Sequence, residues 1–511
     1  MTLFAAAGVF SSEVAKAAGN ETLVRSSNCG YLLPDLSPTE SNPVNELAAN
    51  AQEANETLAA DAYSRACYGS VQDALQCNQY PRAKIPWTTT ANVSCPFDQD
   101  LCWDGPTSAF KIESGLIDSH YDLGINSKRL DRLQHRKATT CSVLHTKDHA
   151  YQTNETDENG DPVRIARYTF GGFGASIDEG TANTTFIYNL HGNVGTSGYA
   201  LVPFVSYSGQ AQQTWYPIPE LNRTDADVTI MFLAPNTVSY LSPVYDPWFH
   251  ATTPTNLSSG DLNMTNYLPD YTVGVLACAD QFQLCNPVNN KCTNLTAVST
   301  LQNESRNLLL NEVQAFTLTD IFYTMVNGRT YNNVQSRGAN SLRVTDTLSG
   351  STFTQIGLPD NQWTIEVTNL FAVSMARMQQ EIINYATGPS YSSQGLEFVK
   401  GEKTICERQK IRSASGYISF SVLGVSIILV LGTLEWGADA VPVTRKGEML
   451  EFAGGENSGL EKNGYRSAQR AEEHGTPSLV AERNEGGGGN GHFEGVGVVN
   501  AGEKTRMLDG T

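Results

Sequence analysis

The stretch YTVGVLACADQFQLCNPVNNKC, residues 271–292, joins a β-rich run to three cysteines. Its first part, Tyr271–Ala279, is rich in β-branched and aromatic residues, which is typical of a strand. Cys278, Cys285 and Cys292 follow at intervals of seven residues. Since three is an odd number, at least one of these cysteines pairs outside the stretch or stays free.

Similar β-rich runs precede this stretch, separated by turn clusters such as Asn159–Gly160, Asn193–Gly198 and Pro235–Asn236. The runs are Arg167–Phe170, Thr185–Leu190, Tyr199–Tyr207 and Val228–Ala234. Short strands with turn-rich spacers indicate an antiparallel sandwich or layered sheet. We therefore expect residues 67–300 to be mainly β-structure and loops.

Helical patterns flank this β-rich centre. Within residues 20–66, Asn42 can cap a helix that begins at Pro43. Its predicted buried face carries residues at a 3.6-residue period. That face consists of Leu47, Ala51, Ala54, Leu58, Ala62 and Ala66.

Residues 304–388 form the second predicted helical region. One face of its first helix carries Leu309, Val313, Phe316, Ile321 and Met325. Asp360 can cap a second helix that Gly388 ends. The apolar stripe of that second helix is Trp363, Val367, Leu370, Met375, Met378, Ile382 and Tyr385. The predicted fold class is thus α+β, with an antiparallel β-rich centre flanked by helices.

The ten cysteines indicate a fold held together by disulfides in an oxidising compartment. Short separations, as between Cys67 and Cys77 or Cys95 and Cys102, suit local loops, but spacing alone does not assign the pairs. The disulfide candidates are Cys29, Cys67, Cys77, Cys95, Cys102, Cys141, Cys278, Cys285, Cys292 and Cys406.

Ten N-x-S/T triplets, the acceptors of N-linked glycans in secreted chains, occur in the same part of the sequence. Chance alone produces several such triplets in a chain this rich in Asn, Ser and Thr. The glycosylation candidates are Asn20, Asn55, Asn92, Asn154, Asn183, Asn222, Asn256, Asn263, Asn294 and Asn303.

The uncharged segment GYISFSVLGVSIILVLGTL, residues 416–434, is long enough to cross the hydrocarbon core of a bilayer as a helix. All the cysteines and triplets precede it. We therefore expect a transmembrane helix at 416–434, with residues 1–415 outside at the plasma membrane or in the secretory pathway. Basic residues before the segment favour the reverse orientation, but large domains translocate largely regardless of flanking charge.

The two ends of the chain differ from its middle. Residues 435–511 are rich in glycine and poor in aromatic residues, which predicts a disordered cytoplasmic tail. Residues 1–19 begin with the short apolar run MTLFAAAGVF. That run lacks the basic start of a signal peptide, so we interpret residues 1–19 as a possible remnant of an upstream membrane helix or signal. The extracytoplasmic domain then spans residues 20–415.

Composition and motifs exclude several function classes. Of 511 residues, 53 are acidic and 34 basic, so a general affinity for nucleic acid is not expected. His145 and His149 have the spacing of zinc ligands on a helix but lack the glutamate of a zinc protease. No catalytic residue, cofactor-binding residue or metal ligand is predicted, and no cofactor is expected.

Two loops carry aromatic side chains that favour either a sugar-stacking surface or ordinary packing over a sheet. They are TWYPIPEL, residues 214–221, and YLSPVYDPWFH, residues 240–250. Packing is the commoner outcome for such loops.

Several blocks together resemble a family of uncharacterised integral membrane proteins of filamentous ascomycete fungi. The blocks are FSSEVAKAAGNETLVRSSNCGYL, SCPFDQDLCWDG, DSHYDLGINSKRLDRLQHRKATTC, LACADQFQLCNPVNNKC and CERQKIRSASGYISFSVLGVSIILVLGTL. The resemblance covers roughly residues 10–434 and implies further membrane helices before the first block. It implies no activity, substrate or catalytic residue.

The expected function is that of a membrane-anchored glycoprotein with an extracellular binding or sensing domain. Its expected partners are the lipid bilayer, through residues 416–434, and an extracellular protein or polysaccharide. The alternative is a carboxylate-dependent ectoenzyme such as a glycosidase, which needs two facing carboxylates about 5–10 Å apart in a pocket.

Overall fold

The computed structural model describes residues 21–412 with gaps, together with Ser426. The gaps are residue 25, residues 35–42, 70–76, 78, 157–159, 174–182, 191–196, 211–212, 214, 260–261 and 389–395. The predicted segments 1–19 and 435–511, the span 416–434 apart from Ser426, and the predicted cap Asn42 lie outside these residues. None of the helices in the described ranges combines the length and apolar character that crossing a membrane requires.

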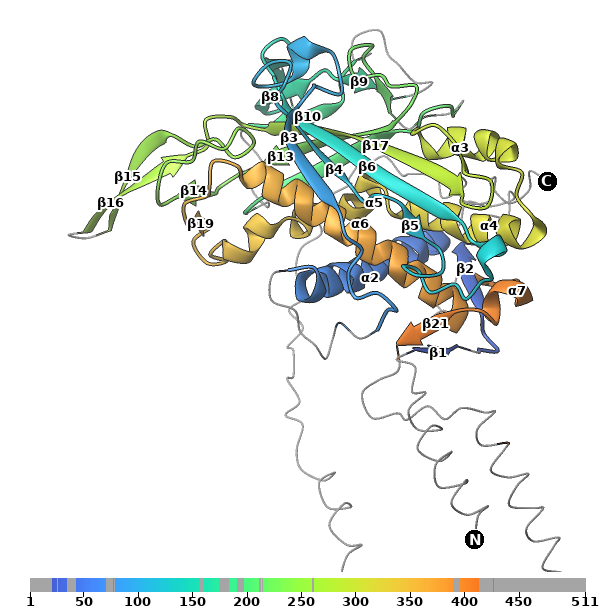
Figure 1. Ribbon diagram of the computed structural model, residues 1–511. Helices are drawn as coiled ribbons and strands as arrows, with labels where there is room; N and C mark the ends of the chain where they lie inside the picture. The colour runs from blue at the N-terminus through green and yellow to red at the C-terminus, as the bar shows by residue number, and fades with distance from the viewer. Residues whose placement is uncertain are drawn as a thin grey trace, which may run out of the picture. The chain divides into compact units, whose positions relative to one another are not determined.

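The fold is α+β, as predicted, and its centre is a mainly antiparallel sheet (Figure 1). Its strands run in the order β11 (Ala200–Ser206), β13 (Asp227–Ala234), β17 (Gly274–Asn286), β6 (Gln134–Leu144), β4 (Ala109–Glu113) and β3 (Thr88–Val93). The short strands β5 (Ile117–Asp118) and β18 (Lys291–Cys292) pair with β6 and β17. The quoted stretch 271–292 thus supplies a central strand and its terminal hairpin.

Both faces of the central sheet are covered. Along β13, Met231 and Leu233 belong to a core shared with the helices, while Ile230 and Phe232 belong to a core on the opposite face. Because alternate residues of a strand point to opposite faces, a strand buried on both sides is largely apolar, as residues 230–234 are here. The result is a layered arrangement in which the sheet lies between helices and a second β-layer.

The second β-layer and the smaller sheets use the remaining strands. The layer contains β7 (Ala150–Thr156), β8 (Pro162–Tyr168) and β10 (Phe186–Asn189), with β9 (Gly171–Gly172) paired to β12 (Tyr216–Pro217). A hairpin of β15 (Thr253–Ser259) and β16 (Leu262–Leu268) extends beside β14 (Ser239–Tyr240) and β19 (Thr354–Gln355) (Figure 1).

The helices are α2 (Pro43–Cys67), α3 (Val298–Glu304), α4 (Glu312–Asn327), α5 (Thr330–Gln335), α6 (Gln362–Thr387) and α7 (Lys403–Cys406). Short 3₁₀ turns occupy η2 (Gln99–Leu101), η3 (Arg129–Asp131), η4 (Ser305–Leu308), η5 (Gly338–Ser341) and η6 (Arg343–Thr347). Helix α6 packs against both α2 and α4 (Figure 1). Its predicted stripe is buried, apart from a half-buried Tyr385, and Phe371, Val373 and Arg377 are buried as well.

Three details of the helix predictions are wrong. Leu47 and Leu58 are 69% and 52% exposed, because α2 instead buries the face that carries Thr57, Ala60, Asp61, Tyr63 and Ser64. The side chain of Asp360 does not cap α6, which begins after Asn361. Leu309 lies outside α4 in a left-handed turn and is 69% exposed.

The N- and C-terminal parts of the domain lie side by side. Strand β1 (Glu21–Leu23) pairs with β21 (Lys410–Arg412), and β2 (Gly30–Pro34) pairs with β20 (Leu396–Lys400). The Cys29–Cys406 disulfide joins the same two segments. Gly388, which ends α6 as predicted at φ 88°, allows Asn28 to approach, because a Cβ there would lie 2.2 Å from the Asn28 carbonyl oxygen.

All ten cysteines are paired, in agreement with the prediction of a disulfide-rich fold. Cys67–Cys77, Cys95–Cys102 and Cys285–Cys292 close local loops, and Cys141–Cys278 joins the neighbouring strands β6 and β17. Of the three cysteines in the quoted stretch, Cys278 is the one that pairs outside it.

Candidate functional site: a surface row of aromatic rings

Five aromatic rings from four separate segments form a continuous row, which we call the aromatic row. Its members are Tyr245, His250, Tyr271, Trp103 and His145. Successive ring centroids along the row are 6.4, 5.9, 5.3 and 5.0 Å apart. Tyr245 is 60% exposed and the other four residues are partly buried, so the row is accessible to solvent.

The Cys95–Cys102 loop positions one end of the aromatic row. Cys102 bridges to Leu144 at the end of β6. On either side of that bridge, the Trp103 amide donates to the Val143 carbonyl at 2.9 Å and the His145 amide donates to the Leu101 carbonyl at 2.8 Å. These bonds align the loop with the strand end, and their spacing brings the Trp103 and His145 rings together.

Asp270 holds the other end of the row. Its carboxylate lies 2.6 Å from Nδ1 of His250 and accepts hydrogen bonds from the amides and hydroxyls of Thr252 and Thr253. Partial burial disfavours the charged form, yet the bonds from Thr253 and Thr252 hold the pKa of Asp270 at about 2. A carboxylate that stays ionised fixes the orientation of the His250 ring beside Tyr271.

The two aromatic loops singled out in the sequence are mostly packing elements. Trp215 is fully buried, and in the second loop Tyr240, Trp248 and Phe249 are 1–3% exposed. From these loops only Tyr245 and His250 join the aromatic row. Trp103, His145 and Tyr271 were not predicted, because they come from segments that are distant in sequence and no local pattern relates them.

The aromatic row offers apolar faces with polar atoms close by. Phenol and indole groups combine a large apolar ring with one hydrogen-bonding group, a combination that suits ligands with both C–H faces and hydroxyls. Neighbouring planes in the row are inclined by 34° to 80°. The rings therefore do not form one flat platform, and each is suited to contact a different unit of an extended ligand.

A separate pocket of about 140 Å³ lies between β2, α2, α4 and α6. Three tyrosines line it: the ring of Tyr31 lies 5.8 Å from that of Tyr323 and 5.9 Å from that of Tyr385. Gln380 also lines the pocket, and its buried Oε1 has no hydrogen-bond partner. The pocket thus combines aromatic walls with the side-chain amides of Gln52, Gln380 and Asn384.

Two carboxylates, Glu56 and Glu381, line this pocket together. Both are bound to the fully buried Arg377, at 2.8 and 2.9 Å. A glycosidase needs one carboxyl group that keeps its proton near neutral pH. Since both carboxylates are taken up in ion pairs with one buried arginine, we interpret this pair as a structural link between α2 and α6 rather than as an acid and its partner base.

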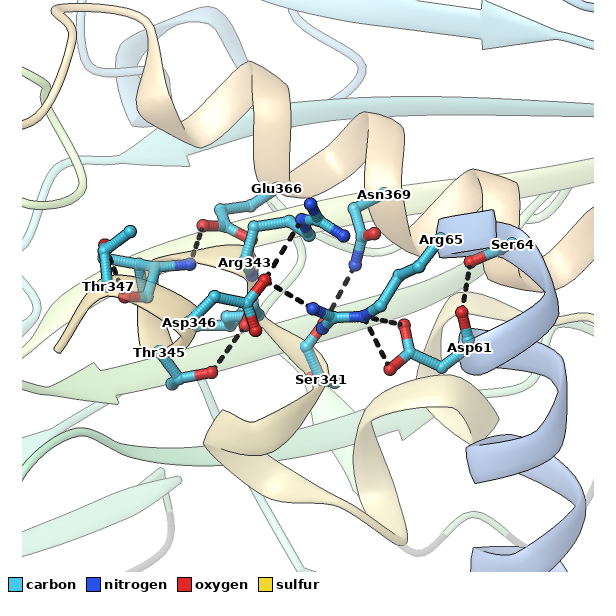
Figure 2. Close-up of polar contacts among 12 residues, drawn as sticks. Asp61, Ser64, Arg65, Ser341, Arg343, Thr345, Asp346, Thr347, Glu366 and Asn369 are labelled. Carbon is cyan, nitrogen blue, oxygen red and sulfur yellow. Dashed lines mark hydrogen bonds and ion pairs between the residues drawn. The ribbon is translucent and has the colours of Figure 1, made fainter. Parts of the chain in front are cut away.

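Other carboxylates are engaged in structural contacts. Figure 2 shows Arg65 between Asp61 and Asp346, so that α2 is linked to η6. In the same view, Glu366 of α6 accepts the backbone amides of Arg343 and Val344 at 2.6 and 2.8 Å. These contacts fix the position of the 338–347 segment against α6 and α2.

Asp118 and Asp122, two carboxylates four residues apart, stabilise a turn. Asp118 accepts the amides of His120 and Tyr121, and Asp122 accepts the Asp118 amide at 2.7 Å while pairing with Arg82.

The two histidines with the spacing of zinc ligands make different contacts. His145 belongs to the aromatic row, whereas Nδ1 of His149 lies 3.2 Å from the Thr169 carbonyl oxygen. Across the described ranges, no three His, Cys, Asp or Glu side chains group as metal ligands do.

The side chains of the glycosylation candidates are exposed wherever the structure describes them. Asn20 lies outside the described residues, and nothing is described of the Asn263 side chain. The other eight candidates, Asn55, Asn92, Asn154, Asn183, Asn222, Asn256, Asn294 and Asn303, are all exposed. By contrast, Asn266, Asn286, Asn327 and Asn333, which belong to no triplet, are at most 2% exposed.

Comparison with protein-family models, with curated proteins and with solved structures finds no match to this chain. The function is therefore inferred from the residues of this chain alone.

Proposed function

We propose that this chain is a membrane-anchored glycoprotein whose extracellular domain binds polysaccharide through the aromatic row. The observation that carries the proposal is the row itself, five rings in succession that end at the exposed Tyr245. Aromatic rings in spatial succession, one exposed and four partly buried, suit the repeating C–H faces of a sugar chain. The hydroxyls of Thr252 and Thr253 lie at the same end; each donates its proton to Asp270, and each oxygen keeps the capacity to accept a bond from a sugar hydroxyl.

The disulfides support the extracellular part of the proposal. Five pairs account for every cysteine, and such pairs persist in secreted and surface proteins rather than in the cytosol. The exposure of eight acceptor asparagines is compatible with glycosylation at those positions.

The pairing of the domain's ends is compatible with membrane anchoring through residues 416–434. Glu21 pairs with Arg412, so the chain enters and leaves the described domain at neighbouring positions. Only residues 413–415 separate β21 from the predicted span, which limits that connection to about 14 Å.

The proposal is tested with the full chain in detergent, mixed with insoluble chitin and with insoluble β-1,3-glucan. Tyr245→Ala and Tyr271→Ala each remove a ring from the aromatic row, and we expect each to weaken sedimentation with the polysaccharide about tenfold. Tyr151→Ala removes a tyrosine of comparable exposure, 45%, from β7 outside the row and serves as the matched control. Equal sedimentation of wild type and both row variants, or no sedimentation of wild type, would refute binding through the row.

A further inference from the structure

The pocket between β2, α2, α4 and α6 has a glycosylation candidate in its wall. Asn55 and Glu56 of the triplet Asn55-Glu56-Thr57 both line the pocket, and the side chain of Asn55 is exposed. Gln52 and Ala59 line it too. These positions lie three and four residues from Asn55, so they form one face of α2 with it. A group attached to Asn55 would begin at the pocket.

The hydroxyl of this triplet is inaccessible in the folded domain. Thr57 is fully buried, and its Oγ1 accepts a hydrogen bond from Nη1 of Arg377 at 2.6 Å. A glycan on Asn55 must therefore be attached before α2 packs against α6. The attached sugar is then already present when the pocket forms around it.

The pocket suits one sugar ring. A cavity of about 150 Å³ holds a benzene molecule, so the volume of about 140 Å³ fits a single six-membered ring. Tyr31, Tyr323 and Tyr385 offer ring faces and edges to the C–H groups of a pyranose. The side-chain amides of Gln52, Gln380 and Asn384 also line the pocket, and amide groups can bond both the hydroxyls and the acetamide of N-acetylglucosamine.

We propose that the pocket binds the first N-acetylglucosamine of a glycan carried by Asn55, so that this sugar is part of the folded domain. The inference rests on the glycoprotein part of the proposed function but not on polysaccharide binding by the aromatic row. It distinguishes Asn55 from Asn154 on β7, which is exposed and does not line the pocket.

The test uses the full chain expressed in yeast, with site occupancy measured by glycopeptide mass spectrometry. Endoglycosidase H trims every glycan to its first N-acetylglucosamine and so removes effects of the outer sugars. After trimming, we expect the unfolding midpoint of wild type to stay within 1 °C of the untrimmed protein. We expect Asn55→Gln to lower that midpoint by about 2–3 °C, while the matched variant Asn154→Gln leaves it unchanged.

A second measurement does not depend on the folding of Asn55→Gln. Peptide-N-glycosidase F, applied to untrimmed native protein, should release the Asn55 glycan at least tenfold more slowly than the Asn154 glycan. Tyr323→Ala opens one wall of the pocket and should remove most of that difference. Equal release rates at Asn55 and Asn154 in the wild type would overturn the inference. So would glycans found at other triplets with Asn55 unmodified. Neither result would contradict the proposal that the protein is glycosylated. The absence of a glycan at every triplet would instead refute the proposal that the protein is a glycoprotein.

Discussion

Asp246 caps α6 from a distant loop: its Oδ2 accepts the backbone amide of Trp363, 117 residues later and in the first turn of the helix, at 2.8 Å. Its Oδ1 accepts the amides of Trp248 and Phe249 at 2.9 and 3.1 Å. One side chain thereby fixes both the 240–250 loop and the start of α6. Tyr245 of the aromatic row is the residue next to Asp246, so this contact also positions the row.

Removal of the Asp246 carboxylate should destabilise the domain. Asp246→Ala leaves three buried amides without an acceptor, and we expect a loss of about 3 kcal/mol in the free energy of unfolding. Asp246→Asn keeps one acceptor oxygen and should lose less. Denaturant unfolding measures both variants. Equal stability of Asp246→Ala and wild type would show that the cap contributes nothing.

Stability should depend on pH through Asp320 of α4. This side chain is 7% exposed and its Oδ2 has no hydrogen-bond partner, and burial raises its pKa to about 8. An unfolded aspartate titrates near pH 4. Because the folded pKa is the higher one, the contribution of this group to stability is fully present below about pH 4 and is lost as the pH rises through about 8.

Asp320→Asn removes this titration. The stability of the variant relative to wild type should therefore increase steadily between about pH 4 and pH 8 and stay constant above that range. Thermal unfolding of both proteins across pH 4–9 measures the difference. Because the comparison is between two chains that share every other titrating group, a difference that does not change with pH would contradict the raised pKa.

Arg377 should be essential for the packing of α2 on α6. It is fully buried and binds Glu53, Glu56 and Glu381 at 2.8–2.9 Å. Arg377→Met leaves these carboxylates without their cation, and we expect a loss of about 4 kcal/mol. Lys403→Met removes a lysine that is 85% exposed from a 3.9 Å ion pair and should change little. Comparable unfolding midpoints for the two variants would be incompatible with this account.

The Cys29–Cys406 disulfide should contribute more stability than Cys285–Cys292. The first closes a separation of 377 residues and the second one of seven. In the chain-entropy model these correspond to about 6 and about 2 kcal/mol. Paired Cys→Ser replacements at each disulfide, followed by denaturant unfolding, test the order. The reverse order would mean that residual structure in the unfolded chain outweighs loop length.

Local patterns in the sequence predicted the elements that depend on neighbouring residues. The runs around Val228–Ala234 and Tyr271–Ala279 are strands because β-branched and apolar residues fill both faces of a buried sheet. Gly388 ends α6 because a positive φ is needed there. The buried face of α2 was predicted wrongly, since Thr57 and Asp61 are buried through their hydrogen bonds with Arg377 and with Arg65 and Arg337.

The sequence by itself determined the α+β class, the regions of the helices α2, α4 and α6, and strands such as β13, because each follows from the chemistry of adjacent residues. Only the tertiary structure decided that Asp246 caps α6, that Cys141 pairs with Cys278, and that Trp103, Tyr271 and His250 form one row. Those contacts join residues 21 to 168 positions apart. They form because packing on both faces of the central sheet brings distant loops together. Local hydrophobic periodicity in the sequence does not indicate which distant segments will meet.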